Sequence, residues 1–331
     1  MRILAGDIGG TNARLALVRV DDGRLVHGDE VRLPSRDFAS LEALLRSFLD
    51  LHAGPVAAAG LGLPGPVRDG RVAPTNLPWS VDARQLRQAL KLEQLWLLND
   101  LEALAHGLDG AAVETLQSGQ ATAGGNRAVI AAGTGLGQAV LYWDGTCFHP
   151  YATEGGHADF APRNELQFEL LRFLQQRYDR VSWERLVSGP GLVNIFEFLC
   201  SRPGAQPAVS PLAQADPPAA VTEAALAKSC PVARHSLALF VELYGAEAGN
   251  LALKAMATGG LFVAGGIAPR ILAPLREPPF VEAFVSKGRM RGLLESMPLH
   301  VVLDDATGLR GAALFAARQG GVVPAGGPPR E

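Results

Sequence analysis

The chain has 331 residues, of which 48% are hydrophobic, and this length is enough for two packed cores rather than one. A wholly disordered chain is therefore excluded. Lys and Arg total 30 against 33 Asp and Glu, so the net charge is −3 and no broad basic field exists to attract nucleic acid or an anionic membrane surface. These numbers favour a globular protein that binds neither nucleic acid nor membrane.

The three cysteines, Cys147, Cys200 and Cys230, are far apart and include no C-x-x-C pair. Such spacing offers neither a disulfide framework nor a zinc-binding pair, and it favours a reducing compartment. The N-terminal apolar run is too short for a signal peptide, and no apolar stretch of membrane-spanning length follows. We therefore expect a cytoplasmic protein.

Residues 2–8 and 13–20 are short and aliphatic, and Gly9-Gly10-Thr11-Asn12 joins them. This pattern predicts a β-hairpin at the start of a sheet. The elements that follow alternate between strand and helix, as in an α/β fold. They are a strand near 26–33, a helix over 38–52, a strand over 56–63, a helix over 82–90, a strand over 95–98 and a helix over 101–108.

The same order begins again in the second half of the chain. Residues 127–132 and 138–143 are predicted strands on either side of the glycine turn 133–137, which makes a weak internal repeat. Helical patterns then cover about 164–200 and 234–257, and a strand near 261–264 runs into Gly265-Gly266. The sequence thus predicts two related halves.

The glycine turns are the candidate functional elements, because they leave backbone N–H groups on a surface that no Cβ blocks. Two such turns could hold the phosphates of a nucleotide. No G-x-x-x-x-G-K-[ST] motif occurs, and the turn at Gly9-Gly10 leads into a strand rather than the helix of a dinucleotide fingerprint. A single turn of this kind is more often a plain hairpin. Asp7 favours a functional role, since a carboxylate ending a buried strand is costly unless it is paired, solvated or bound to a cation.

A series of motifs, in order along the chain, resembles those of bacterial glucokinases. They are residues 6–17 (GDIGGTNARLAL), 75–79 (TNLPW), 98–103 (LNDLEA), 133–137 (GTGLG), 154–162 (EGGHADFAP), Glu184 with 188–192 (SGPGL), and 259–270, from Gly259-Gly260 to Pro269-Arg270. The resemblance covers the chain apart from residues 202–221 and the C-terminal tail. It implies an α/β protein with the two-domain actin-like ATPase (ribonuclease H-like) fold, in which a cleft lies between a small α/β domain and a larger α+β domain.

On this resemblance we place the small domain at residues 1–107, completed by a helix at about 305–320, and the large domain at 108–304. Residues 202–221 are rich in Pro, Ala and Ser and are expected to form a surface loop. The Gly/Pro-rich tail, 321–331, is expected to be frayed. The family also implies a homodimer, and two domains that close on the sugar so that water does not compete for the γ-phosphate.

The resemblance implies a glucokinase of glycolysis, an ATP-dependent transferase that phosphorylates the 6-hydroxyl of glucose with Mg²⁺ as its metal. Such a transfer needs an aligned hydroxyl, a base for its proton, and cations or N–H donors for the charge. Asp100 is the candidate base, because it follows the buried strand 95–98 at the carboxyl end, where open α/β sheets place ligand-contacting groups. The alternative is that Asp100 caps a helix beginning at Leu101.

The residues that match the family's sugar-binding positions carry carboxylates, an amide and an imidazole, which suit a hydroxyl-rich ligand. They are Asn99, Asp100, Glu154, His157 and Glu184, with Gly135 presenting its backbone. His157 could instead be a structural histidine or a metal ligand, although no Cys or second His lies nearby at ligand spacing. For Asp159 and Asn76 a structural polar role is equally open.

The resemblance assigns the nucleotide to the glycine-rich segments, namely Gly6, Asp7, Ile8, Gly9, Gly10, Thr11, Gly133, Thr134, Gly265 and Gly266. Asp7 would organise Mg²⁺ through water, since Mg²⁺ keeps much of its hydration and uses one or two carboxylates beside the phosphates. For Gly259-Gly260 the preferred interpretation is structural: the pair ends a helix and leads into the next strand.

Three rival functions share part of this pattern. The first is a kinase for another hexose or an amino sugar, although the C-x-C-G-x-x-G-C zinc motif of the related repressor and sugar-kinase family is absent. The second is a sugar-sensing regulator, which would need a helix-turn-helix before Gly6, where we expect none. The third is a polymerising or chaperone-like ATPase. Such a protein binds no hexose, so it would not need the sugar-binding residues described above.

Overall fold

The computed structural model describes residues 2–21, 24–52, 54–74, 77–204 and 210–322. Within the chain two compact units form. Unit 1 comprises Met1–Ala112, Leu141–Ala152 and Asp304–Glu331, and unit 2 comprises Val113–Val140 and Thr153–Leu303. Compared with the expected division, unit 1 extends a few residues beyond 107 and includes the additional segment Leu141–Ala152. Sequence patterns could not reveal that segment, because it groups with unit 1 through tertiary contacts alone.

The sheet of unit 1 has the strand order β3-β2-β1-β5-β8, with β4 also beside β2. Its strands are β1 Arg2–Ile8, β2 Asn12–Asp21, β3 Arg24–His27, β4 Val31–Pro34, β5 Ala58–Leu63 and β8 Gln94–Asn99. β1 and β2 are antiparallel and form the predicted hairpin, whereas β1, β5 and β8 are parallel. The strand predicted near 26–33 is interrupted at residues 28–30. β3 and β4 run in the same direction along β2, but the pairing register shifts by one residue between them, from Val18 opposite His27 to Leu15 opposite Val31. The Gly28 N–H, at the start of the interruption, still donates to the Leu17 carbonyl at 2.9 Å.

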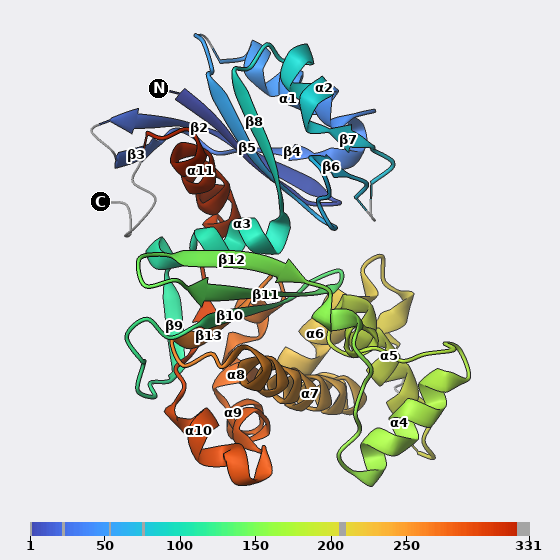
Figure 1. The fold of residues 1–331 in the computed structure, drawn as a ribbon. Helices are drawn as coiled ribbons and strands as arrows, with labels where there is room; N and C mark the ends of the chain where they lie inside the picture. The colour runs from blue at the N-terminus through green and yellow to red at the C-terminus, as the bar shows by residue number, and fades with distance from the viewer. Residues whose placement is uncertain (1, 22–23, 53, 75–76, 205–209, 323–331) are drawn as a thin grey trace. The chain divides into compact units, whose positions relative to one another are not determined.

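Helices cover both faces of this sheet (Figure 1). They are α1 Leu41–Asp50, α2 Ala83–Ala89, α3 Asp100–His106 and α11 Thr307–Gln319, and the short strands β6 Arg71–Val72 and β7 Val81–Asp82 pair separately. Leu4 and Ile8 of β1 pack with α1, while Ala5 packs with α11. The two-residue period of a strand therefore divides the core of unit 1 into two layers. α1 starts later than the predicted residue 38, because Ser40 caps it by accepting from the Ala43 N–H.

Two glycines let α11 and α3 lie against their neighbours without a gap. A Cβ at Gly60 of β5 would collide with the Ala312 carbonyl of α11, and one at Gly311 of α11 would collide with the Ala103 carbonyl of α3. The backbones can approach this closely only because neither position carries a side chain. This packing fixes the start of α11 near the end of β1.

The second sheet has the strand order β12-β11-β10-β13-β14-β9. Its strands are β9 Val113–Gln117, β10 Arg127–Ala132, β11 Leu136–Trp143, β12 Phe148–Thr153, β13 Gly260–Ala264 and β14 Leu299–Val302. As in the first sheet, a glycine turn joins two neighbouring strands, and the first of these runs parallel to the next strand inward. The internal repeat predicted from the sequence is thus visible in the strand order.

The helices of unit 2 are α4 Glu165–Gln175, α5 Gly189–Cys200, α6 Pro217–Leu226, α7 Pro231–Ala255, α8 Leu272–Arg276, α9 Pro278–Val285 and α10 Arg291–Ser296. The helical stretches predicted over 164–200 are two helices, since α4 ends at Gln175 and Ser188 caps the start of α5 by accepting from the Gly191 N–H. The loop expected over 202–221 is shorter, because Asp216 caps α6 and Pro217 starts it. Residues 205–209 and most of the expected frayed tail lie outside the described residues.

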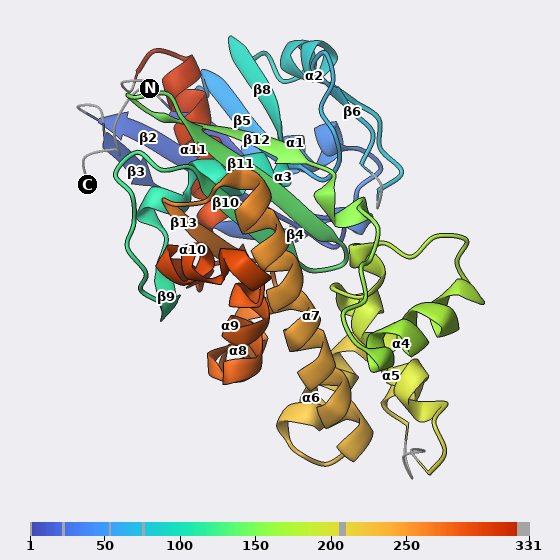
Figure 2. The ribbon, with the colours of Figure 1, turned by 60° about the horizontal axis from the view of Figure 1, so that its bottom comes forward.

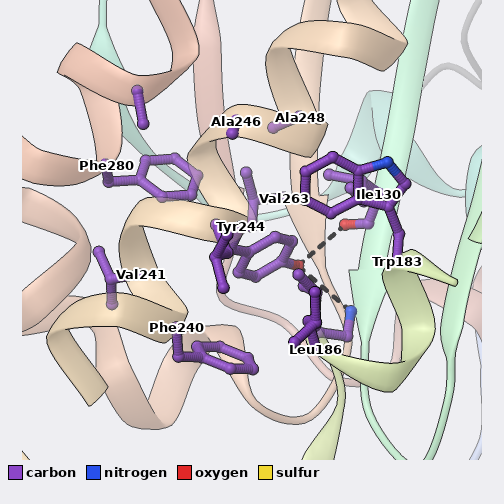
Figure 3. Packing of buried hydrophobic residues seen from close by; sticks show 14 of the residues in the cluster. Ile130, Trp183, Leu186, Phe240, Val241, Tyr244, Ala246, Ala248, Val263 and Phe280 are labelled. Carbon is purple, nitrogen blue, oxygen red and sulfur yellow. Dashed lines mark hydrogen bonds between the residues drawn. The ribbon is translucent and has the colours of Figure 1, made fainter. Parts of the chain in front are cut away.

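The core of unit 2 is built around α7, a helix of 25 residues that runs beside α9 (Figure 2). Tyr244, at the middle of α7, is fully buried and packs edge-on against Phe240 and Phe280 (Figure 3). Among the described residues, no helix combines the length and apolar character needed to cross a membrane.

Candidate functional site

The glycine turn between β1 and β2 is held from one side by Ser35. The Gly9 N–H closes the turn by donating to the Asn12 carbonyl at 2.9 Å. Ser35 is fully buried, and its hydroxyl donates to the Gly9 carbonyl at 2.7 Å while its N–H donates to the Thr11 carbonyl at 2.9 Å. Among the residues that the structure describes, none accepts from the N–H of Gly10 or Thr11. These donors can therefore serve an anion.

Sequence reasoning missed Ser35, because it lies 26 residues from Gly9 and belongs to none of the motifs. Gly6 and Ile8, two residues of β1 predicted to bind the nucleotide, have no side chain available for a ligand. Ile8 is fully buried in the core, and a Cβ at Gly6 would lie 2.7 Å from a Leu61 methyl group, so both can present only backbone.

Asp7 lies near the end of β1 and opposite Arg14 of β2 in the antiparallel register. Burial raises the pKa of its carboxyl to about 6, against the attraction of Arg14 and with added repulsion from Glu30 and Asp305. The first turn of α11 is close, since a Cβ at Gly308 would lie 3.0 Å from Asp7 Oδ2. An ionised Asp7 is therefore costly here, and a bound cation would offset that cost.

Arg14 joins this site to the start of α11, a link that sequence reasoning did not find. Its Nη1 donates to the Asp305 carbonyl at 2.6 Å, its Nη2 pairs with the Asp305 carboxylate, and Glu30 lies 3.7 Å away. Asp305 comes two residues before α11 and also pairs with Arg32 at 3.1 Å. No local pattern signals a pair 291 residues apart.

Asn99 ends β8 and Asp100 follows it, at the same sheet edge as Asp7. The parallel register places Asp7 beside Gly62 of β5, and Leu63 of β5 beside Asn99 of β8. Because parallel strands end at one edge of a sheet, these polar groups gather there. Asp100 thus lies just beyond the carboxyl end of the strand predicted over 95–98.

The alternative role for Asp100, capping a helix that begins at Leu101, is wrong. α3 begins at Asp100 itself, and its cap is Asn99, whose Oδ1 accepts from the Leu101 N–H at 2.9 Å. Asp100 Oδ1 also accepts from the Leu101 N–H at 2.9 Å. The Asn99 amide in turn donates to the Gly65 carbonyl at 3.1 Å, which leaves it one N–H for any ligand.

In unit 2 the glycine turn after β10 is hydrogen-bonded to the carboxylate of Glu184. The Gly133 N–H donates to the Gly135 carbonyl at 2.9 Å, and the Gly133 carbonyl accepts from the Gly189 N–H at 2.8 Å. The Leu136 N–H donates to Glu184 Oε2 at 3.0 Å, and a Cβ at Gly135 would lie 2.5 Å from that same oxygen. Gly135 therefore lets the turn and Glu184 lie in contact.

A second glycine turn of unit 2 lies beside the first. Parallel pairing aligns Ala131 of β10 with Ala264 of β13, so Gly133 and Gly265 follow neighbouring strand ends. Gly265 has a φ of 84°, and a Cβ there would lie 2.5 Å from the Ala132 carbonyl oxygen. By contrast, a Cβ at Gly133 or Gly266 would meet nothing within 4 Å, so there is open space beside the backbone at these two positions.

The Tyr244 hydroxyl contacts the backbone at the ends of both β10 and β13. It accepts from the Ala132 N–H at 3.2 Å and lies 3.3 Å from the carbonyl oxygens of Ile130 and Ala264, to one of which it can donate (Figure 3). Burial raises the pKa of this hydroxyl far above its usual range, so it stays protonated. The sequence places Tyr244 on the apolar face of a helix but does not indicate this role.

We expect Tyr244→Phe to lower the free energy of unfolding by about 1–3 kcal/mol, because it leaves the buried Ala132 N–H without its acceptor. Urea unfolding measures this change. Tyr142→Phe is the matched control, since Tyr142 is 55% exposed and its hydroxyl deletion should have little effect. Equal stabilities of the two variants would contradict the role assigned to Tyr244.

Three predicted sugar-binding side chains meet beside Gly135. His157 Nδ1 lies 3.9 Å from Glu184 Oε1, and His157 Nε2 lies 3.8 Å from Glu154 Oε2. The side chains of Glu154 and His157 are 65% and 54% exposed, whereas that of Glu184 is 27% exposed. A fixed carboxylate flanked by two accessible polar groups can bind several hydroxyls. Asn99 and Asp100 belong to unit 1, and this group belongs to unit 2.

The remaining candidates have other surroundings. Asp159 is 75% exposed and pairs with Arg180, which also donates to the His157 carbonyl, so its contacts are those of a structural residue. Asn76 lies outside the described residues. A Cβ at Gly259 would collide with the Gly125 carbonyl, which agrees with a structural role between helix and strand rather than with ligand binding. In the described parts of the chain, His157 has no set of ligand atoms close enough to hold a metal ion.

A family model described as glucokinase matches residues 4–319. The glucokinase of Trichormus variabilis is 42% identical over 339 residues, covering 96% of this chain and 99% of that protein. A crystal structure of a glucokinase from an Antarctic psychrotroph is 34% identical, with a TM-score of 0.81 over 96% of this chain and 99% of its own. The structure of a ROK family glucokinase from Streptomyces griseus in complex with glucose and AMPPNP has a TM-score of 0.65 at 22% identity. The match covers 96% of this chain and 100% of that one, and at this identity it supports only a shared fold. The chain therefore belongs to the glucokinase family of hexose kinases.

Proposed function

We propose that this protein transfers the γ-phosphoryl group of ATP to the 6-hydroxyl of glucose, with Asp100 as the general base. The observation that carries the proposal is the Glu184 group beside Gly135, where a carboxylate fixed by backbone is flanked by His157 and Glu154. This group matches the chemistry of a hexose, which offers several hydroxyls to donors and acceptors. The proposal includes a cytoplasmic homodimer that acts in glycolysis.

Asp100 would take the proton of the 6-hydroxyl as the phosphoryl group is transferred. Its Oδ1 accepts from the Leu101 N–H, and it is the first residue of α3, so it lies at the positive end of the helix dipole. An ionised carboxylate can accept a proton from a hydroxyl that the sugar-binding residues hold in place. Asn99 and Glu184 would orient the other hydroxyls.

The glycine turns would bind the phosphates of ATP. Gly10 and Thr11 offer backbone N–H groups for which the described residues provide no acceptor, and Ser35 holds the turn in place through the carbonyls of Gly9 and Thr11. Gly133 and Thr134 would also lie against the phosphates, and Gly265 and Gly266 would border the nucleotide. Positioned N–H donors stabilise the charge that develops on the transferred group. The AMPPNP complex of the Streptomyces griseus relative supports ATP as the donor.

Asp7 would hold Mg²⁺. The fit rests on the chemistry of the residue, since a carboxylate oxygen is the ligand that Mg²⁺ prefers, and burial raises the pKa of this carboxyl to about 6 in the absence of a cation. When bound, Mg²⁺ neutralises negative charge on the phosphate oxygens. Arg14 lies opposite Asp7 in the strand pairing and is anchored by Asp305, so it adds a positive charge near the Asp7 carboxyl.

An ADP-coupled assay across a panel of hexoses and N-acetylated amino sugars, with ATP, GTP and polyphosphate as donors, tests the proposal. We expect the highest kcat/KM with glucose and ATP. A higher kcat/KM with another sugar would contradict glucose as the substrate. A higher kcat/KM with polyphosphate would contradict ATP as the phosphoryl donor. Size-exclusion chromatography with light scattering tests the homodimer.

We expect Glu184→Gln to raise the KM for glucose about 10- to 100-fold with a smaller change in kcat. The variant keeps one carbonyl oxygen for the Leu136 N–H but loses the negative charge that accepts from sugar hydroxyls, and charged hydrogen bonds are worth about 1.5–3 kcal/mol. Steady-state kinetics with saturating ATP measures the change. Glu165→Gln, on the exposed start of α4, is the matched control and should leave KM unchanged. An unaltered KM in Glu184→Gln would remove this residue from the sugar site.

A further inference from the structure

The turn between β11 and β12 gathers three different metal-ligand side chains. Asp144, Cys147 and His149 each bring one ligand atom to a common point, all within 4.8 Å of one another. Asp144 Oδ2 lies 2.6 Å from His149 Nε2, Cys147 Sγ lies 3.3 Å from that nitrogen, and Cys147 Sγ lies 3.8 Å from Asp144 Oδ2. This cluster is part of unit 1, and the proposed kinase chemistry does not use it.

The arrangement does not suit nucleophilic catalysis. A Cys–His–Asp triad needs one ring nitrogen to face the thiol and the other to face the carboxylate. Here Cys147 and Asp144 both face Nε2 of His149. One nitrogen cannot serve both partners at full strength, whereas a metal ion at the centre of the three atoms would satisfy all of them.

The carboxylate of Asp144 is held in place before any ligand arrives. Its Oδ1 accepts from the Thr146 N–H and hydroxyl, both at 2.7 Å, and from the Cys147 N–H at 2.8 Å. The other oxygen, Oδ2, is therefore directed toward His149. Hydrogen bonds of this kind orient ligands in known metal sites and strengthen metal binding.

The spacing of the three atoms approaches that of a tetrahedral zinc site. Zinc bonds of about 2.0–2.3 Å at tetrahedral angles place neighbouring ligand atoms about 3.3–3.7 Å apart. The two separations that involve Cys147 Sγ, 3.3 and 3.8 Å, are already close to this range. The third, 2.6 Å, is a hydrogen bond that would open as both atoms turned to the metal. Asp144 and His149 are exposed, so water could take the fourth position.

We propose that Asp144, Cys147 and His149 form a binding site for one Zn²⁺ ion. A thiolate, an imidazole and a carboxylate are a ligand set for Zn²⁺ rather than for Mg²⁺ or Ca²⁺, which prefer oxygen ligands alone. The site closes the β11–β12 turn, because its ligands come from both ends of that turn. Bound Zn²⁺ therefore stabilises the hairpin without entering the phosphoryl transfer.

Cobalt titration of the reduced, chelator-treated full chain tests the site. Co²⁺ bound by Cys147 gives a thiolate-to-cobalt charge-transfer band together with the visible bands of tetrahedral cobalt, and Zn²⁺ should displace it one for one. We expect Cys147→Ser to abolish the charge-transfer band and to weaken Zn²⁺ binding about 100-fold, and His149→Ala to weaken it similarly. Zn²⁺ should also raise the melting temperature of the wild type but not of Cys147→Ser.

Two matched variants separate this site from other surface ligands. Cys200→Ser removes another partly exposed cysteine, and His235→Ala removes an exposed histidine of α7, so both should bind cobalt like the wild type. Circular dichroism and kinase activity confirm that each variant is folded. A cobalt complex without the charge-transfer band, or equal Zn²⁺ affinity in the wild type and Cys147→Ser, would overturn the proposal. Loss of the band in Cys200→Ser would also overturn it, because the thiolate would then be a different one.

Discussion

Asp100→Asn is expected to lower kcat by about 10²- to 10⁴-fold while leaving the fold intact, the range that general base catalysis contributes. The amide oxygen of Asn can still accept from the Leu101 N–H, so the start of α3 keeps its hydrogen bond. The amide cannot take the proton of the 6-hydroxyl. Because the variant keeps the shape of the site, the KM for glucose should change much less than kcat.

Glu102→Gln is the matched control for this experiment. Glu102 lies in the same helical turn as Asp100, and the substitution removes the same charge from the same end of α3. Rates from the ADP-coupled assay, with circular dichroism for the fold, compare the two variants. A near-normal kcat in Asp100→Asn, or an equal loss in Glu102→Gln, would refute the assignment of Asp100 as the base.

Asp7→Asn is expected to have two opposite effects, a more stable protein and a much less active enzyme. With burial raising the pKa of Asp7 to about 6 from an ordinary 3.8, the ionised carboxyl destabilises the native state by about 3 kcal/mol at neutral pH. Asn removes this cost. It also removes the charge that would hold Mg²⁺, so kcat/KM should fall by about 100-fold or more.

The pH dependence of stability tests the first effect. Between about pH 4 and pH 6 the native state binds this proton more tightly than the unfolded chain does, so the stability of the wild type falls as pH rises through that window. The advantage of Asp7→Asn should therefore be absent near pH 4 and complete above about pH 6. Metal-free urea unfolding at about pH 4 and about pH 8 measures it. An advantage that is the same at both pH values would contradict the role of burial.

Asp37→Asn serves as the control for Asp7. Asp37 is exposed in the short helical turn that follows Ser35, so its loss should alter neither the pH dependence nor the rate. If Asp7→Asn kept full activity at low Mg²⁺ concentration, Asp7 would not be the residue that organises the metal.

Local patterns predicted the elements that build the site. Alternating and continuous apolar runs identified the β1–β2 hairpin, the strand β8 and its repeat at β10 and β11, because burial of one or both faces imposes such patterns. The differences occurred where an interruption or a loop divides a stretch. Residues 28–30 interrupt one predicted strand through a register shift, and residues 176–188 separate two helices within the helical stretch 164–200.

The contacts that hold the site could not be predicted in this way. Ser35 reaches Gly9, Asp305 reaches Arg14, and Tyr244 reaches the end of β10, each across a long stretch of sequence. Such pairs leave no periodic signal, because each depends on how separate elements pack. The capping role of Asn99 is a similar case, since the sequence pattern suggested Asp100 as the possible cap and the structure gives that role to Asn99.

The sequence by itself determined where the glycine turns and the carboxylates of this protein lie along the chain, because a backbone that must approach a ligand excludes side chains and a buried strand requires apolar ones. Only the tertiary structure decided which carboxylate each turn meets. Strand register brings Asp7 and Asn99 to one sheet edge, and packing places Glu184 against Gly135. The glycines of these turns have their function there, in contacts that long-range packing creates.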